Sequence, residues 1–328
     1  MTINSLIYKI GRPLGALKLS KRLTRKHPRI LMYHRVHRSG YKYGLSEDIF
    51  REQMRRIKKS FNVLTLEELL FENYSGRFPE NAVVVTFDDG YYDFSKYAFP
   101  IMKEEGIRPT LFITTGFVNG DLWLWPDKIR YALDNTCVDE FGIDQISTVL
   151  NLKLDAERAW HLISDYCLTI KNHEKEVFIR SLYRKLEVKM PTTPPRDYRP
   201  VSWNEVREMM KDGLDVGSHS HSHPILTKLN EGELSDELKK SKELILKELK
   251  VTTRIFCYPN GQRTDFNDKV KEYVSDAGYQ YAVSAFPAMN PLACPFELNR
   301  YSIDNNMDNF EKVLYGLSFL ALKAENNL

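Results

Sequence analysis

Cysteine is scarce in this chain, and long hydrophobic runs are absent from it. The 328 residues include four cysteines, at positions 137, 167, 257 and 294, and no two of them are close in sequence. This spacing argues against a zinc ribbon or a disulfide scaffold and favours a reducing compartment. No stretch approaches the roughly 18 apolar residues that a membrane-spanning helix needs. With 42% hydrophobic and 28% charged residues, the composition is typical of a globular protein with a substantial core.

Acidic residues are absent from the first 46 positions, so the N-terminal part of the chain is strongly basic. Residues 1–28 combine lysines and arginines with spaced leucines and isoleucines, but lack the continuous apolar core and cleavage site of a signal peptide. We therefore expect a cytoplasmic protein. A basic amphipathic segment can lie on the inner face of an anionic membrane. A tail, or a helix packed on the protein, is equally compatible, since Gly11, Pro13 and Gly15 interrupt the pattern.

Beyond this segment the charges are nearly balanced. The formal net charge of the whole chain is only +3, and no motif of a nucleic-acid-binding domain is present. We expect no nucleic-acid partner, and the sequence does not indicate an oligomeric state.

Short apolar runs alternate with amphipathic patterns along most of the chain. We expect helices at 46–59, 97–105, 202–213, 235–250 and 268–277, and strands at 29–36, 83–87, 110–115, 214–216, 255–258, 281–284 and 298–303. This alternation is typical of a parallel α/β barrel or a doubly wound sheet. Residues 121–200 break the rhythm with helix-like segments that end in the proline-rich stretch 190–195. They indicate a helical insertion, which is equally compatible with a lid.

Two adjacent carboxylates follow one of the expected strands. Residues 83–90 are Val-Val-Val-Thr-Phe-Asp-Asp-Gly, a run that suits a strand buried on both faces. Successive side chains point to opposite sides, so Asp88 and Asp89 would project differently around one mouth of the sheet. Active sites of parallel sheets and barrels lie at this carboxyl end. A solvated strand-to-loop junction is the alternative.

Three of the eight histidines fall within five residues, at positions 219, 221 and 223. The spacing of His219 and His223 lets two imidazoles reach one metal ion. A carboxylate from the other strand end would complete a ligand set typical of hydrolytic zinc sites with an open water position. The second acid of the Asp-Asp pair would then be available as a base. Ordinary, hydrogen-bonded histidines are the alternative.

These residues resemble a known family. Thr86-Phe-Asp-Asp-Gly90 followed by His219-Ser-x-x-His223-Pro is similar to motifs of the polysaccharide deacetylases, the NodB-homology or carbohydrate esterase family 4 enzymes. The segments 31–36, 256–261 and 277–279 match as well, so the resemblance covers roughly residues 29–118 and 200–303. It implies a distorted (β/α)7 barrel over residues 29–320, interrupted by an insertion at about 121–200, after an N-terminal segment 1–28. It also implies metal-dependent removal of N-acetyl groups from the amino sugars of a polysaccharide or a lipid-linked glycan.

The resemblance assigns roles to the motif residues. Asp88 corresponds to the general base, and the metal ligands are Asp89, His219 and His223, for a divalent ion that we expect to be Zn²⁺. The backbone N–H of Tyr258 corresponds to a donor that stabilises the oxyanion.

The general acid is less directly assigned, because no histidine follows His223. The branch that includes poly-N-acetylglucosamine deacetylases uses a histidine in an early Tyr-His motif, which makes His34 the candidate here. A strand-end histidine that only packs or caps is the alternative for His34.

Two further features depart from the family pattern or fall outside it. The arginine that many members carry before the Pro-Tyr/Phe of their third motif is missing, so Arg300, on the late strand, is the candidate for charging and orienting Asp88 on the substrate side of the site. Trp123 and Trp125 would stack on a sugar ring or pack in the core.

Other functions remain compatible with the same residues. A related hydrolase would remove O-acetyl or formyl groups with the same machinery. A catalytically inactive carbohydrate-binding relative would have no need for a second acid beside the metal. A ferrous oxygenase also uses two histidines and a carboxylate, but its usual His-x-Asp pair is absent.

Overall fold

A curled sheet of short parallel strands forms the centre of the computed structural model, which describes residues 15–40, 42–146 and 148–325. The strand order is β11-β10-β9-β6-β5-β1-β12. A further strand, β4, pairs with the first half of β5, whereas β6 pairs with the last residues of β5. The strands are β1 (Arg29–Tyr33), β4 (Asn62–Leu64), β5 (Ala82–Phe87), β6 (Thr110–Ile113), β9 (Asp215–Ser218), β10 (Ile255–Cys257), β11 (Tyr281–Val283) and β12 (Tyr301–Ser302).

One segment brings the two edges of this sheet together. Leu298 forms a parallel bridge with Val283 of β11, and a few residues later Tyr301 pairs with Leu31 of β1. The chain between Leu298 and Ser302 therefore closes the sheet into a distorted barrel. The predicted α/β barrel is confirmed, whereas the last expected strand, 298–303, is regular only at 301–302.

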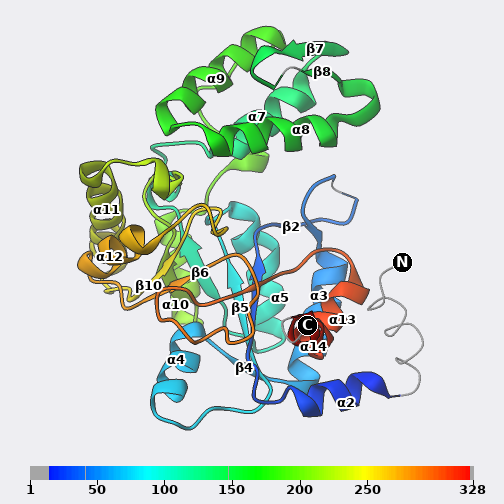
Figure 1. The fold of residues 1–328 in the computed structure, drawn as a ribbon, viewed down its shortest axis with the longest axis vertical. Helices are drawn as coiled ribbons and strands as arrows, with labels where there is room; N and C mark the ends of the chain where they lie inside the picture. Colours follow the sequence, from blue (N-terminus) through cyan, green and yellow to red (C-terminus); the bar gives the residue numbers. More distant parts are fainter. Residues whose placement is uncertain (1–14, 41, 147, 326–328) are drawn as a thin grey trace.

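Alternate side chains of the strands pack into two cores, because successive residues point to opposite faces. Leu31 and Val83 face the surrounding helices, while Ile30 and Val84 point into the barrel. The surrounding helices are α3 (Glu47–Ser60), α5 (Phe99–Glu104), α10 (Trp203–Lys211), α11 (Glu231–Leu249), α12 (Asp268–Asp276) and α13 (Met307–Leu314), which Figure 1 shows around the sheet. A further helix, α4 (Leu66–Tyr74), contributes its leucines to the barrel core.

Local signals placed most of these elements correctly. The capping boxes at Thr65 and Ser202 begin α4 and α10 with reciprocal side-chain and backbone hydrogen bonds. Several boundaries differ from expectation, such as the end of β1 at Tyr33 and the start of α11 at Glu231. The strand expected at 214–216 runs from Asp215 to Ser218, and the helix expected at 97–105 is a π-helical turn at Phe94–Ala98 followed by α5.

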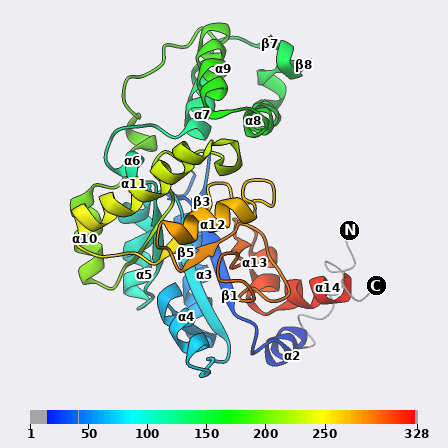
Figure 2. The same cartoon turned by 60° about the vertical axis from the view of Figure 1, so that its left-hand side comes forward.

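Residues in the expected insertion form a small body with its own hydrophobic core. It contains α7 (Trp125–Asn135), α8 (Leu152–Thr169) and α9 (Asn172–Lys185), and Figures 1 and 2 show it stacked on one end of the barrel. The sequence predicted only helices here, but β7 (Glu140–Ile143) and β8 (Thr148–Asn151) form an antiparallel hairpin. The short α6 (Thr115–Val118) precedes this body, and β2 (Val36–His37) pairs with β3 (Leu45–Ser46).

The two ends of the described chain pack against each other. Figure 2 shows α2 (Ala16–Leu23) beside α14 (Leu317–Glu325), and the ring of His27 stacks on Phe319 with 3.9 Å between centroids. Residues 1–14, half of the basic segment predicted at 1–28, lie outside the described residues, and α2 is the helical part of the other half. Within the described ranges, no helix has both the length and the hydrophobicity to cross a membrane.

Candidate active site

Polar side chains collect where the barrel strands end. Asp88 and Asp89 follow β5, His219 and His223 follow β9, and Arg300 precedes β12. All five are buried. Since buried ionisable groups are unfavourable unless paired, hydrogen-bonded or bound to metal, the contacts of each one reveal its role.

Asp89 lies between the two histidines. Its Oδ1 atom is 3.5 Å from Nε2 of His219 and 3.5 Å from Nε2 of His223. The Nδ1–H of His219 donates to the carbonyl oxygen of Cys257 at 2.9 Å, which directs the Nε2 lone pair toward Asp89. The buried Oδ1 atom of Asp89 has no hydrogen-bond partner among the described residues. Two imidazole nitrogens and an orphaned carboxylate oxygen converge on one point.

The backbone is held in unusual conformations around this point. Asp89, Ser220 and His223 have φ values of 75°, 64° and 55°, in the left-handed region that residues other than glycine rarely adopt. Backbone strain of this kind persists where the surroundings enforce it, and it clusters at functional sites. Here it turns the carboxylate of Asp89 and the ring of His223 toward each other.

The protonation states also suit metal binding. Burial lowers the pKa of His219 to about 4 and the pKa of His223 well below its ordinary value, so both imidazoles are neutral with free lone pairs. Burial and the neighbouring Asp88 raise the pKa of Asp89. A cation at this point would favour the ionised carboxylate. Asp89, His219 and His223 therefore fit a divalent metal ion, which their ligand atoms can all reach, lying within 4.8 Å of one another.

Asp88 is held quite differently, by Arg300. The guanidinium donates to Oδ1 at 2.7 Å and to Oδ2 at 2.8 Å, a bidentate pair that is fully buried. Burial alone would raise the pKa of Asp88, but Arg300 holds it below its ordinary value. Asp88 is thus an ionised carboxylate beside the metal-ligand set.

Arg300 acts on Asp88 and has no N–H left for a substrate. Its remaining donors bond to the carbonyl of Ser284 at 2.9 Å, to Thr86 Oγ1 at 3.1 Å and to Cys257 Sγ at 3.1 Å. From the sequence, Arg300 was predicted to lie on the substrate side of the site and to charge and orient Asp88. The geometry makes it a positioning residue for that carboxylate.

A second group of candidate ligands shares this region but fits a metal less well. Asp88, His219 and Cys257 also lie within reach of one another. Burial raises the pKa of the Cys257 thiol well above its ordinary value, so the thiol stays protonated and is a poor ligand. Both oxygens of Asp88 are already engaged by Arg300. The set around Asp89 is the stronger metal site.

Comparison with known proteins identifies the family. A family model described as polysaccharide deacetylase matches residues 75–141 and 143–282. The chain belongs to the polysaccharide deacetylase family. Among curated relatives, the poly-beta-1,6-N-acetyl-D-glucosamine N-deacetylase of Staphylococcus aureus (strain MSSA476) is 32% identical over 104 residues, which is 27% of this chain and 36% of that protein. The match thus spans little more than a third of that relative's length.

Solved structures show the same fold at low identity. The Streptococcus pyogenes deacetylase PplD in complex with acetate has a TM-score of 0.58 and 19% identity, covering 90% of this chain and 96% of its own. IcaB from Ammonifex degensii has a TM-score of 0.57 and 19% identity, covering 88% and 96% of the two chains. These matches extend the likeness to the barrel of a polysaccharide deacetylase over most of the chain.

Other predicted residues of this family member lie around the same site. The Nε2 atom of His34, after β1, is 3.8 Å from Asp88 Oδ2, and its side chain is 47% exposed. His34 therefore borders the open mouth and not the buried interior. The neighbouring His221 is buried, bonds through Nδ1 to Thr115 Oγ1 at 3.0 Å and lies outside the metal-ligand set.

Tyr258 is in a position that complicates its expected role. Its backbone N–H donates to the carbonyl of Val283 at 3.2 Å, a bond between the β10 and β11 chains, and its hydroxyl donates to the carbonyl of Phe296 at 2.9 Å. A bond from this N–H to a developing oxyanion has to share or replace the bond to Val283. The oxyanion role of Tyr258 stays a prediction.

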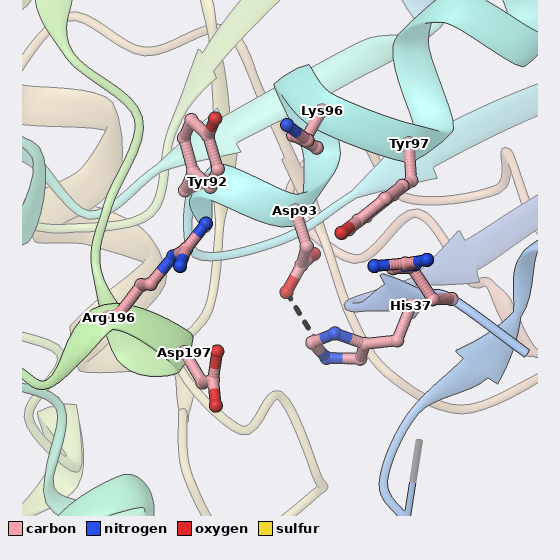
Figure 3. Close-up of a pocket in the computed structure, with 8 residues that line it drawn as sticks. His37, Tyr92, Asp93, Lys96, Tyr97, Arg196 and Asp197 are labelled. Carbon is pink, nitrogen blue, oxygen red and sulfur yellow. Dashed lines mark ion pairs between the residues drawn. The ribbon is translucent and has the colours of Figure 1, made fainter. Parts of the chain in front are cut away.

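A separate cavity of about 430 Å³ opens beyond β2, and Figure 3 shows its lining. Asp93 accepts a hydrogen bond from Arg35 at 2.8 Å and lies 3.3 Å from Nε2 of His37. Arg196 and Lys96 also reach this cavity. It includes none of the predicted site residues.

Proposed function

We propose that this chain is a metal-dependent hydrolase that removes N-acetyl groups from the amino sugars of a polysaccharide or a lipid-linked glycan. The observation that carries the proposal is the division of labour between adjacent carboxylates. Asp88 is paired with Arg300 and ionised, whereas Oδ1 of Asp89 has no donor in the described part of the chain and faces two neutral histidines. A binding protein would not need the first, and a site without a metal would leave the second unsatisfied.

The residues would divide the reaction as follows. Asp89, His219 and His223 would hold a divalent ion, which we expect to be Zn²⁺, and Asp88 would accept the proton of the attacking water. When bound, the ion supplies a Lewis acid for the substrate carbonyl. Arg300 keeps the carboxylate of Asp88 oriented and charged. His34, at the exposed mouth, would protonate the leaving amine, and the N–H of Tyr258 would stabilise the oxyanion.

The direct test is acetate release from a substrate panel. We expect release from N-acetylated glucosamine oligomers or their lipid-linked forms, loss of release after chelation, and recovery when Zn²⁺ is added back. The panel includes O-acetylated and N-formylated analogues of the same sugars. Faster release from either analogue would assign the alternative deacylase activity. Absence of release from every substrate by metal-loaded protein would contradict the hydrolase proposal.

We also propose that residues 1–28 contact the inner face of the membrane, where a cytoplasmic enzyme would meet a lipid-linked substrate. Supporting this, Leu19 and Leu23 of α2 are 60% and 64% exposed, beside basic residues of the same helix. Sedimentation with phosphatidylglycerol vesicles tests the contact. We expect Leu19→Glu with Leu23→Glu to abolish binding, while Phe71→Glu, at another exposed apolar position, leaves it intact. Cell fractionation that finds the protein only outside the cytoplasm would contradict the location.

A further inference from the structure

A second, smaller cavity adjoins the metal-ligand set. It has a volume of about 210 Å³ and lies between the insertion and the loop that follows β9. The ligand candidate His223 forms part of its wall, together with Trp123, Trp125, Asn172 and Lys175. Asn172 and Lys175 belong to the first turn of α9, the end at which a helix dipole is positive. A group bound here would sit directly beside a substrate held at the metal site.

The wall of this cavity contains hydrogen-bond donors that lack acceptors. The indole Nε1 atoms of Trp123 and Trp125 and the Nδ2 atom of Asn172 are buried with no partner in the described part of the chain. The other two tryptophans do have acceptors: Trp160 donates to the carbonyl of Pro126 and Trp203 to Asn119 Oδ1. Native proteins rarely leave buried donors unsatisfied, because each one loses its hydrogen bonds to water.

The cavity also carries an unbalanced positive charge. Lys175 is only 3% exposed, and its ammonium lies 4.6 Å from the ring centroid of Trp125 and donates to Asn172 Oδ1 at 3.0 Å. No ion pair of Lys175 with a carboxylate occurs among the described residues, and Glu176 and Asp265 act on it only as neighbouring charges. The other charges of the wall cancel, because Glu176 receives both of its bonds from Lys128, at 2.9 Å and 3.0 Å. A buried ammonium without a counter-ion is unfavourable.

We propose that this cavity binds an anionic oxygen group of the substrate, a phosphate or a carboxylate, next to the sugar whose acetyl group is removed. Such a group supplies a negative charge for Lys175, next to residues of the wall whose indole and amide donors lack acceptors in the described part of the chain. Hydrogen bonds in which the donor or the acceptor is charged are stronger than those between neutral partners. The contribution of this anionic group to turnover rests on the proposed deacetylase function, whereas its binding to the cavity does not. The substrate class would then be an acidic or phosphate-linked amino sugar and not a neutral polymer.

Kinetics on matched substrates test the role in turnover. The three substrates are a neutral N-acetylglucosamine tetramer, the same tetramer with a phosphate at its reducing end, and one with a glucuronate next to the reacting sugar. We expect kcat/KM of the metal-loaded enzyme to be at least about tenfold higher for one anionic substrate, since one well-placed charged hydrogen bond is worth about 1.5–3 kcal/mol. Whichever substrate is preferred identifies the source of the anion.

Variants then separate a role in binding the anion from a role in folding. Lys175→Met removes the ammonium and keeps a side chain of similar length, and Trp125→Phe removes the indole N–H and keeps an aromatic ring. Both should abolish the preference while kcat/KM for the neutral tetramer stays within about threefold. Lys171→Met is the matched control, because it removes an exposed lysine just before the same helix, and it should keep the preference. Equal losses on neutral and anionic substrates would assign a structural role and overturn the proposal.

Direct binding keeps this proposal separate from the proposed function. Calorimetry with pyrophosphate and with glucuronate, on protein stripped of metal, should show binding of one of them by the unmodified chain and by Lys171→Met. Lys175→Met and Trp125→Phe should bind at least about tenfold more weakly. Binding without any deacetylase activity would support the anion site and contradict the function. Absence of both binding and substrate preference would show that water satisfies these donors, and would overturn the proposal.

Discussion

At the scale of single residues, two neighbours of the same type are made different by what surrounds them. Asp88 lies against a guanidinium that donates to both of its oxygens, and Asp89 lies against two imidazoles that donate nothing to it. The left-handed backbone at Asp89, with φ of 75°, turns its carboxylate away from Arg300. Adjacent positions on one strand end can thus serve as a base and as a metal ligand.

This difference predicts separable effects of removing each charge. Asp89→Asn should lose both bound metal and activity, because a neutral amide is a weaker ligand than a carboxylate. Asp88→Asn should keep near-stoichiometric metal while turnover falls by about 10²–10⁴-fold, the usual contribution of a general base. Metal analysis by mass spectrometry beside acetate release checks both. Loss of metal in Asp88→Asn would show that the two roles are not divided in this way.

The pairing of Asp88 with Arg300 predicts a large effect on stability. Arg300→Met leaves a buried carboxylate without its partner, so the free energy of unfolding should fall by about 3–5 kcal/mol. The double variant Asp88→Asn with Arg300→Met should lose less than the sum of the single losses, since the two groups are in contact. Denaturant unfolding of the four proteins measures the coupling. Additive losses would mean that the pair contributes no interaction energy.

His34 is predicted to act on the leaving group. His34→Ala should keep its metal and lose about 10²–10⁴-fold in turnover of an N-acetyl sugar, because the amine must be protonated to leave. The same variant should retain most of its rate on an aryl acetate, whose phenolate leaves without a proton. Similar losses on both substrates would return His34 to a packing or capping role.

At the scale of the elements, the buried strands were the easiest part of the fold to predict from the sequence. The run Val83–Val85 is apolar at every position because β5 is covered on both faces, and its end marks the site. The hairpin of β7 and β8 was not predicted, since four-residue strands inside a helical segment give no usable alternation. Arg300 was a candidate partner of Asp88 only because the arginine that many family members use is missing, and no spacing indicates the pair, because 212 positions separate the two residues.

The opposite, amino end of the barrel strands carries a charge that weakens the fold at neutral pH. Asp215 opens β9 and accepts a hydrogen bond from Thr110 Oγ1 at 3.0 Å, and burial, with Glu67 nearby, raises its pKa to about 6 from the ordinary 3.8. Because the pKa is higher in the folded protein, its contribution to stability is fully present below about pH 4 and is lost as the pH rises through about 6.

Asp215→Asn should therefore change the pH dependence of stability and leave the site intact. Relative to the unmodified protein, the variant should gain about 3 kcal/mol in unfolding free energy between pH 4 and pH 7, since one unit of pKa is worth 1.36 kcal/mol. Denaturant unfolding at several pH values measures this gain. A difference that does not vary between pH 4 and pH 7 would show that Asp215 titrates normally.

At the scale of the whole molecule, the chain combines a barrel with an insertion, and the family match at residues 75–141 and 143–282 extends across both. The insertion packs around a core of its own, so its sequence predicts helices but not which of its residues reach the barrel. Asn172 and Lys175 meet His223 only after both bodies have folded. That contact between bodies is where the substrate would be selected, and no motif within either segment could have pointed to it.

The ends of the chain join the fold through another long-range contact. Arg29, fully buried at the start of β1, donates to the carbonyls of Thr24 at 2.9 Å and of Leu314 at 3.1 Å, which ties the end of α2 to the end of α13. Gly316, with φ of +86°, lies directly over Thr24, and a Cβ atom there would come within 2.1 Å of its Oγ1.

Gly316→Ala should consequently loosen both ends together. Gly120→Ala is the matched control, because Gly120 has a similar φ of +82° but open space around it. The control should cost only the strain of the left-handed backbone, about 1–2 kcal/mol, whereas Gly316→Ala adds displacement of Thr24 and should cost more. Hydrogen exchange should then rise in α2 and α14 alike, since each end holds the other in place. Faster exchange in α14 alone would show that the two ends fold independently.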